Sequence, residues 1–412
     1  MITYNSKPRV LFVSHSGQFY GAERSLLTLL VGLRDMDRYE ILVWVPEEGP
    51  LTAALSARDL SYRVLPYSRW IGQRFHPVTR YFRRFRNRLM LSRLLRTARK
   101  WKPDIVYTNT IATPAGAFIT EHLHPRPLHV WHARELPGSR DTAFGLFDLE
   151  KSKSFKIMAR TADAFICNSQ FLRDRLEPLL AGANAPAPSP RIEVIYNGID
   201  EPGVAGMGKN ASEMAAQETT APKRYTPKRN SQDIRIVMAG GISKVKNFED
   251  AIAATGRMKE MGYPVRLEIF GEGSASYVKK LEKEIINSGM EDQIEMMGYR
   301  EDMGAVFSQS DLLLITSRME TFGRVAVEAM LAGCPVISSD AGALPEIVRD
   351  GETGLMYPTG DVDQLVQQIC RLLESPGLRK SLIHNARGFA RTNYSTGPFV
   401  DQIHAVLQNL LQ

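Results

Sequence analysis

The chain has 412 residues, 43% hydrophobic and 24% charged, with a formal net charge of +7, which is the composition of a soluble globular protein long enough for two domains. Cys167, Cys334 and Cys370 form no CxxC pair, so the sequence predicts neither a disulfide framework nor a zinc site, and a reducing compartment fits best. The N-terminal residues lead into a strand without an apolar leader, and no run of about 18 apolar residues occurs, so neither a signal peptide nor a membrane span is predicted.

Short apolar strands alternate with helical stretches through the first half of the chain. Helices are predicted at Ala22–Leu33 and Gln170–Leu180, the second with Ser169 as its N-cap. The alternation favours a parallel, doubly wound sheet. Its strands are predicted at Val10–Val13, Ile41–Val45, Ile105–Tyr107, Leu128–Trp131, Ala164–Cys167 and Ile192–Ile195.

A basic segment interrupts this alternation. No acidic residue occurs between Ser61 and Pro103, and within residues 69–102 arginines and lysines alternate with aromatic and aliphatic residues. From about Val78 to Trp101 the segment is predicted to be a basic amphipathic helix, with Phe82, Phe85, Leu89 and Leu95 at helical spacing. Such a helix fits an anionic membrane surface. The alternatives are a solvated helix that covers the sheet, or nucleic acid, for which no binding module is present.

The strand pattern restarts after residues 201–233, which are poor in large apolar residues and are predicted to be an exposed linker or insertion. The fold class is therefore α/β, with two Rossmann-like, doubly wound parallel-sheet domains facing each other across a cleft. We place the domains at 1–200 and 234–395, followed by a C-terminal helix at 396–412 that packs back across both. Strands are predicted at Ile234–Met238, Val265–Phe270, Gln293–Met296, Leu312–Ile315 and Val336–Ser338.

Loops at the carboxyl ends of parallel strands are where open α/β sheets bind ligands. In the first domain, Gly17 and Gly21 could let the backbone approach a phosphate, although tight turns also need glycine. His132 is predicted to follow a strand and is a candidate for catalysis or for a structural role. In the second domain, Gly240, Lys246 and Gly271 occupy such loops, and Lys246 could pair with a diphosphate or be solvated.

The most informative stretch is Glu320-Thr321-Phe322-Gly323, followed by Glu328. A helix is predicted from Phe322 to Ala332, and its N-terminus favours an anionic group. Carboxylates before and within this helix could bind sugar and ribose hydroxyls. The alternative is an acidic loop residue beside an ordinary amphipathic helix.

Taken in order, these motifs resemble the retaining glycosyltransferases of family four, which have the GT-B fold. The resemblance extends over nearly the whole chain and is most specific from Asp311 to Asp361. It implies that a nucleotide-sugar is held mainly by the second domain and an acceptor by the first. Glu328 would bind the ribose hydroxyls, Glu320 the donor sugar, Lys246 the diphosphate and His132 the transferred sugar. Backbone N–H groups near Thr321, Phe322 and Gly323 would meet sugar or phosphate oxygens, and the Gly21 loop would close over the phosphates.

Two positions depart from the family pattern. Gly241 stands where the family usually has an arginine that clamps the diphosphate together with the lysine, and Lys244 and Arg324 are the candidate substitutes for that arginine. Tyr20-Gly21 stands where two adjacent glycines are usual. The resemblance implies no cofactor and no divalent metal, because fixed cations would stabilise the leaving diphosphate. Asp35-Met-Asp37 and Asp361-Val-Asp363 look like metal motifs but do not follow strands as such motifs should.

The sequence thus predicts a cytoplasmic glycosyltransferase, peripheral on the inner membrane face through residues 69–102. The predicted acceptor is a saccharide, such as a lipid-linked or polysaccharide precursor, and no nucleic-acid partner is expected. One alternative is a GT-B protein that binds nucleotide-sugars or glycans without catalysis, which Gly241 favours. Another is a nucleotide-sugar epimerase or phosphorylase on the same fold.

Overall fold

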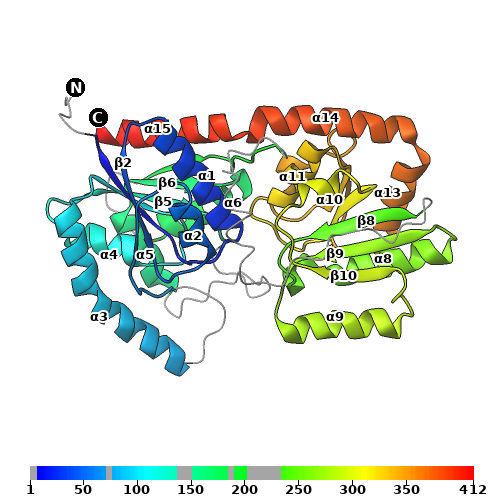
Figure 1. The fold of residues 1–412 in the computed structure, drawn as a ribbon, viewed down its shortest axis with the longest axis horizontal. Coiled ribbons are helices and arrows are strands. Elements are labelled where there is room, and N and C mark those ends of the chain that lie inside the picture. The colour runs from blue at the N-terminus through cyan, green and yellow to red at the C-terminus, as the bar shows by residue number, and fades with distance from the viewer. Residues whose placement is uncertain (1–6, 71–76, 137–150, 184–189, 202–232) are drawn as a thin grey trace. The chain divides into compact units, whose positions relative to one another are not determined.

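The computed structural model describes residues 7–70, 77–136, 151–183, 190–201 and 233–412. The chain divides into two compact units, of which unit 1 comprises residues 1–198, 207–211 and 396–412, and unit 2 comprises residues 199–206 and 212–395 (Figure 1). The predicted linker at 201–233 lies outside the described residues except at its two ends.

Unit 1 is built on a seven-stranded parallel sheet in the order β3-β2-β1-β4-β5-β6-β7. Its strands are β1 (Arg9–Val13), β2 (Glu40–Val45), β3 (Tyr62–Val64), β4 (Ile105–Thr108), β5 (Leu128–Ala133), β6 (Ala164–Cys167) and β7 (Arg191–Val194). Its helices are α1 (Gly21–Asp35), α2 (Pro50–Ser56), α3 (Pro77–Trp101), α4 (Ala115–His122), α5 (Lys151–Thr161), α6 (Gln170–Ala181) and α15 (Thr396–Leu411).

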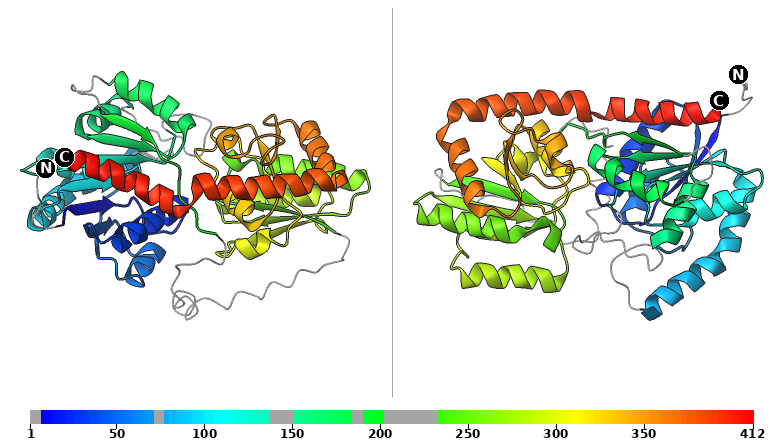
Figure 2. Two further views of the ribbon diagram at one scale, coloured as in Figure 1. Left: turned by 90° about the horizontal axis from the view of Figure 1, so that it is seen from above. Right: turned by 180° about the vertical axis from the view of Figure 1, so that it is seen from behind.

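Both faces of this sheet are covered, because successive residues of a strand point to opposite sides. Val10 and Phe12 of β1 join a core cluster with α1 and α15, whereas Leu11 and Val13 join a second cluster with α3 and α4. This two-sided burial explains why β1 is apolar from Val10 to Val13 instead of alternating with polar residues. Figure 2 shows helices on both sides of the strands.

Unit 2 repeats the plan with a six-stranded parallel sheet in the order β10-β9-β8-β11-β12-β13. Its strands are β8 (Ile234–Ala239), β9 (Val265–Phe270), β10 (Ile294–Gly298), β11 (Leu312–Ile315), β12 (Val336–Ser339) and β13 (Leu355–Tyr357). Its helices are η2 (Lys244–Lys246), α8 (Phe248–Glu260), α9 (Ala275–Asn287), α10 (Gly304–Phe307), α11 (Arg324–Ala332), α12 (Leu344–Ile347), α13 (Val362–Glu374) and α14 (Pro376–Tyr394).

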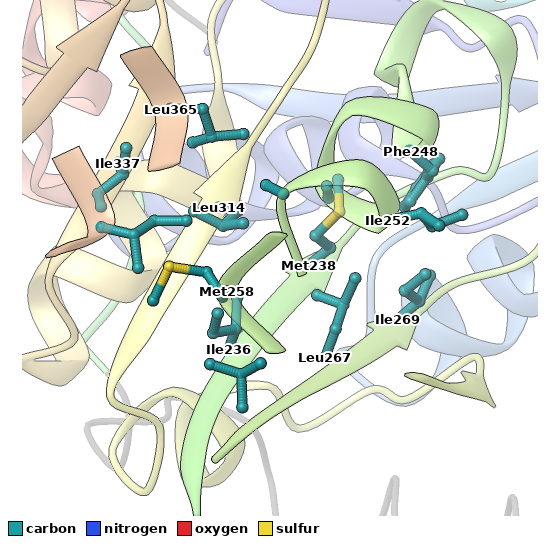
Figure 3. Packing of buried hydrophobic residues seen from close by; sticks show 14 of the residues in the cluster. Ile236, Met238, Phe248, Ile252, Met258, Leu267, Ile269, Leu314, Ile337 and Leu365 are labelled. Carbon is teal, nitrogen blue, oxygen red and sulfur yellow. The ribbon is translucent and has the colours of Figure 1, made fainter. Parts of the chain in front are cut away.

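Figure 3 shows the core on one side of the sheet of unit 2. Ile236 and Met238 of β8 pack against Phe248 and Ile252 of α8, and Leu365 of α13 closes the same cluster. In both units the strand order reverses beside the first strand, between β1 and β4 in unit 1 and between β8 and β11 in unit 2. Ligands of doubly wound folds bind at such switch points.

The end of the chain belongs to two different helices. The helix predicted at 396–412 corresponds to α15, which packs on α1 within unit 1, and the preceding α14 packs on α11 within unit 2. A side chain at Gly32 of α1 would meet Val400 of α15, because an ideal Cβ there would lie 2.5 Å from its Cγ2 atom. Glycine at this position therefore lets the two helices approach closely.

Candidate active site

The two loops that flank the switch point of unit 2 are joined by an ion pair. Lys246 ends the short helix η2 after β8, and its Nζ atom contacts Oε1 of Glu320, which follows β11 and is 74 residues away in the chain. Thr316 secures the loops because its single hydroxyl proton is shared between the carbonyl oxygens of Lys246 and Asn247, which lie 2.9 and 2.7 Å from Oγ1. The sequence predicted both charged residues for the site, but not that they pair with each other.

Glu320 is further positioned by its own loop. Ser317 Oγ donates a hydrogen bond of 3.0 Å to Glu320 Oε1, and Ser339 Oγ donates one of 2.6 Å to the carbonyl oxygen of Ser317. The backbone of Glu320 contacts Gly342, where an ideal Cβ would lie 2.2 Å from the Glu320 carbonyl oxygen. Neither Ser339, the last residue of β12, nor Gly342, in the loop after it, was predicted for the site, because they meet the Ser317 and Glu320 backbone only in the folded sheet.

Helix α11 begins at Arg324, so the prediction that it begins at Phe322 is wrong. Gly323 precedes the helix with a φ of 94°, a left-handed conformation that ends the preceding loop and that few other residues adopt. Phe322 is buried and packs edge-on against Tyr394, so its ring belongs to the core. Thr321 lies half-buried in the loop before Gly323. The positive end of the helix dipole therefore lies two residues later than predicted.

Glu328 lies on α11 and is paired with Arg324 one turn earlier, with 2.7 Å between Arg324 Nε and Glu328 Oε1. Arg324 is thus engaged by Glu328. Lys244, the other residue considered as a substitute for the missing arginine, is exposed. At Gly241 itself an ideal Cβ would meet no atom within 4 Å.

Gly240 and Gly271 end the neighbouring strands β8 and β9. Both have a positive φ, 139° and 144°, and an ideal Cβ on Gly271 would lie only 1.9 Å from the Gly240 carbonyl oxygen. Gly271 is therefore required for the two strand ends to meet. The Lys246 side chain passes beside Gly240, whose ideal Cβ would lie 3.7 Å from Lys246 Cε.

In unit 1, His132 lies within β5 and is fully buried, so the prediction that it follows the strand is wrong. The strand runs two residues further because His132 and Ala133 pair with Ile166 and Cys167 of β6. The hydroxyl of Tyr107 hydrogen-bonds to His132 Nδ1, and Arg134 binds the same nitrogen at 3.2 Å. Burial, reinforced by the charge of Arg134, holds the pKa of His132 well below its ordinary value.

Of the two predicted glycines in the loop between β1 and α1, the structure explains the need for glycine at Gly17 only. An ideal Cβ on Gly17 would lie 2.4 Å from the carbonyl oxygen of Glu47, so glycine is needed there for packing against the loop after β2. Gly21 begins α1 and has open space around it, and the preceding Tyr20 is exposed.

A buried carboxyl group that the sequence analysis did not identify lies beside this loop. Glu23, in the first turn of α1, is fully buried, and neither of its side-chain oxygens has a hydrogen-bond partner among the described residues. His15 Nδ1 lies 3.1 Å from Glu23 Oε1 without hydrogen-bond geometry. Burial raises the pKa of Glu23 to about 7 and lowers that of His15 to about 3, so the contact is not an ion pair of two charged groups at neutral pH.

Glu23→Gln is expected to stabilise unit 1 at pH 8 by about 2 kcal/mol more than at pH 5. Glu23 loses its proton near its ordinary pKa of 4.5 in the unfolded state and only near pH 7 in the folded state. The free energy of unfolding of the wild type therefore falls as the pH rises from 4.5 to about 7, and it stays lower above that range. Glutamine does not titrate. Thermal unfolding at both pH values measures the difference, with the exposed Glu48→Gln as control. Equal pH dependence in wild type and Glu23→Gln would contradict the prediction.

The aspartates that resemble metal motifs have other contacts. Asp361 caps α13 by accepting a hydrogen bond of 2.9 Å from Gln364 N, and Asp363 pairs with Arg257. Asp35 pairs with Arg34 and Asp37 with Lys7. Within the described ranges, no three His, Cys, Asp or Glu side chains gather as a metal ion would require.

Two family models match the chain, Glycosyltransferase Family 4 over residues 19–201 and Glycosyl transferases group 1 over residues 222–389. Together the two models match most of the chain, which belongs to the family 4 glycosyltransferases. N-acetyl-alpha-D-glucosaminyl L-malate synthase of Bacillus anthracis is 25% identical over 55% of this chain and 55% of its own length. Alpha-D-kanosaminyltransferase of Streptomyces kanamyceticus is 27% identical over 42% of this chain and 45% of its own. The chain thus spans about half the length of these curated relatives.

The fold is that of the GT-B glycosyltransferases. A crystal structure of Anabaena Alr3699/HepE in complex with UDP and glucose has a TM-score of 0.75 and 23% identity, covering 98% of this chain and 100% of that one. Sucrose-phosphate synthase from Thermosynechococcus elongatus has a TM-score of 0.74 and 18% identity, covering 98% of this chain and 99% of the other. The predicted pair of Rossmann-like parallel-sheet domains is confirmed.

Proposed function

We propose that this chain transfers a sugar, with retention of anomeric configuration, from a nucleotide-sugar to a saccharide acceptor carried at a membrane surface. The observation that carries the proposal is the arrangement of Lys246, Glu320 and Glu328 at the switch point of unit 2. One ammonium group and two carboxylates stand in the loops at the strand ends and on the helix beside them. This is a set suited to a diphosphate flanked by two groups of hydroxyls.

The chemistry follows from the charges. As the bond from the sugar to the diphosphate breaks, negative charge grows on the leaving oxygen, and the departing phosphate takes the proton of the acceptor hydroxyl. Lys246 and the positive end of α11 stabilise that charge, and this requires neither a nucleophilic side chain nor a metal ion. Glu320 is held to Lys246 and Ser317 through one oxygen, Oε1. Its carboxylate is therefore already oriented when the donor arrives.

The donor is identified by thermal shift with a panel of UDP-, GDP- and ADP-sugars, followed by product analysis with and without EDTA. The true donor should raise the melting temperature with the logarithm of its concentration. We expect a UDP-sugar, a preference supported by the UDP complexes of Alr3699/HepE. Turnover should persist in EDTA and produce the retained anomer. An inverted product would contradict the mechanism, and no stabilisation by any nucleotide-sugar would contradict the proposed function.

The membrane proposal depends on one face of α3. Phe85 and Leu89 are 52% and 55% exposed and lie one turn apart. Arg93, Arg96 and Lys100 continue the same exposed stripe, whereas Leu94 and Ala98 across the helix pack in the core of unit 1. Leu95, predicted to share a face with Leu89, is buried instead, and the Phe82 side chain lies outside the described residues. Figures 1 and 2 show the N-terminal half of α3 standing clear of the sheet.

An anionic bilayer is the occupant that this stripe fits, because apolar side chains lead into a row of cations in a segment without acidic residues. No helix within the described residues combines the length and apolar character needed to cross a bilayer. The stripe would therefore hold the enzyme beside an acceptor anchored in lipid.

Phe85→Ser/Leu89→Ser is expected to reduce binding to vesicles containing anionic lipid by at least tenfold, since two apolar side chains lose about 3 kcal/mol or more of burial. Cosedimentation with phosphatidylglycerol vesicles measures it. Met261→Ser/Ile286→Ser is the matched control, because these side chains are 57% and 59% exposed and belong to unit 2. Equal loss in both double variants, or equal binding to neutral vesicles by the wild type, would count against the surface proposed.

A second candidate function, binding without catalysis, is favoured by Gly241. Replacing this residue with arginine should lower the Kd for the donor about tenfold, the contribution of one charge-assisted hydrogen bond. The site has room, because an ideal Cβ at Gly241 would meet nothing within 4 Å. Calorimetric titration and turnover measurements distinguish the two functions. An enzyme gains in kcat/KM, whereas a binding protein gains affinity alone, and Gly256→Arg, at an equally open position on α8, is the control.

A further inference from the structure

His132 has two partners on one of its ring nitrogens. The Tyr107 hydroxyl and one terminal nitrogen of the Arg134 guanidinium both contact Nδ1, the latter at 3.2 Å. Both His132 and Arg134 are buried. The other ring nitrogen, Nε2, is also buried and has no hydrogen-bond partner in the part of the chain that the structure describes.

The identity of these partners determines where the imidazole proton lies. A guanidinium has N–H donors and no acceptor, so the nitrogen that it contacts must offer a lone pair. Nδ1 is therefore unprotonated, and the Tyr107 hydroxyl also donates to it. A neutral imidazole carries one N–H, which must then be on Nε2. Protonation of Nδ1 is opposed as well, because burial and the Arg134 charge both lower the pKa of His132.

Arg134 is itself held in place by two asparagine side chains, each of which follows a different strand of the same sheet. Its Nε atom donates a hydrogen bond of 3.0 Å to Oδ1 of Asn109, the residue after β4, and another nitrogen donates to Oδ1 of Asn197, which follows β7. These two amide oxygens occupy separate nitrogens of the guanidinium and direct the remaining one toward His132. The side chain therefore depends on three segments whose strands must be in register.

We infer that Arg134 is a positioning residue that, together with Tyr107, holds His132 as a neutral imidazole with its proton on Nε2, so that His132 acts on substrate only as a hydrogen-bond donor. The inference rests on the proposed function for the identity of the acceptor, which is an oxygen of the bound sugar. It removes general-base catalysis from the roles open to this histidine. It also gives a role to the buried Nε2, which has no hydrogen-bond partner among the described residues and would donate to the substrate oxygen.

Nitrogen NMR of the wild-type protein tests the inference without any activity assay. The protein is labelled with ¹⁵N in its histidine rings, and a His132→Asn variant assigns the signal. We expect Nδ1 of His132 to resonate as a bare imidazole nitrogen and Nε2 as a protonated one, unchanged from pH 6 to pH 8. A proton on Nδ1, or on both nitrogens, overturns the inference.

Kinetics of variants give the second readout. Tyr107→Phe/Arg134→Met removes both donors, and turnover should fall about tenfold, the value of one hydrogen bond, while the ¹⁵N spectrum should show the His132 ring proton no longer confined to Nε2. In a His132→Asn background the same pair should cause no further loss. An equal loss in that background, or a ring proton that stays on Nε2 in the Tyr107→Phe/Arg134→Met spectrum, overturns the role of Arg134.

The two tests separate failure of the inference from failure of the proposed function. If no donor is turned over, or if His132→Asn is fully active, the transfer role is wrong and the NMR result still decides the position of the proton. If the double variant does not fold, as judged by circular dichroism, the wild-type NMR measurement again decides.

Discussion

Replacing Lys246 with methionine is expected to lower kcat for the true donor by about 100- to 1000-fold, the usual effect of removing one preorganised group that stabilises the charge of a transition state. Methionine keeps most of the length of the side chain and removes only its charge. The effect should be large here because Gly241 supplies no second cation at the usual position and Arg324 is engaged by Glu328. Steady-state kinetics at saturating donor measure it.

One complication is that the variant leaves Glu320 without its cation. Glu320 is largely buried, with 12% of its side chain exposed, and an unpaired carboxylate there could distort the loop. Lys246→Met/Glu320→Gln, compared with Glu320→Gln alone, separates the two effects, because glutamine removes the stranded charge and still accepts the hydrogen bond from Ser317. Activity should stay low in the double variant. Recovery would mean that Lys246 serves to neutralise Glu320 and does not bind the diphosphate.

The sequence predicted the parts of the fold and site that depend on local pattern. Strands such as Val265–Phe270 were identified to the residue, because both faces are buried and every position is constrained to be apolar or paired. β3 and β13 were missed, since three-residue strands at sheet edges carry too short a pattern. The N-cap role of Ser169 is confirmed, because Leu172 N donates to its Oγ atom.

The errors and omissions have a common cause in contacts made across the sheet. His132 was placed after its strand because the residues that follow it include both apolar and charged types. Its pairing with Ile166 of β6 nevertheless extends β5. Arg134 was not predicted for the site, because its partners Asn109 and Asn197 are 25 and 63 residues away and meet it only once the strands are in register. The start of α11 was placed too early, because the left-handed φ of Gly323 follows from packing that the sequence does not display.

Gly342→Ala is expected to reduce both stability and activity, and Gly289→Ala only stability. The two glycines share a φ of 63°, so either alanine incurs a similar cost of about 1 kcal/mol for a left-handed conformation. At Gly289 an added Cβ meets nothing within 4 Å, whereas at Gly342 it would lie 2.2 Å from the carbonyl oxygen and 2.7 Å from the nitrogen of Glu320. The backbone of Glu320 must therefore move in Gly342→Ala and not in Gly289→Ala.

That movement carries the carboxylate away from Lys246 and Ser317, the two groups that orient it. We expect kcat/KM for the donor to fall at least tenfold in Gly342→Ala, about the loss of one charge-assisted hydrogen bond, and the melting temperature to fall further than in Gly289→Ala. Gly289→Ala should keep wild-type kinetics. If the two variants have equal melting temperatures and equal kinetics, then Glu320 does not depend on the loop after β12 for its position, and the site is assembled by the Lys246 ion pair alone.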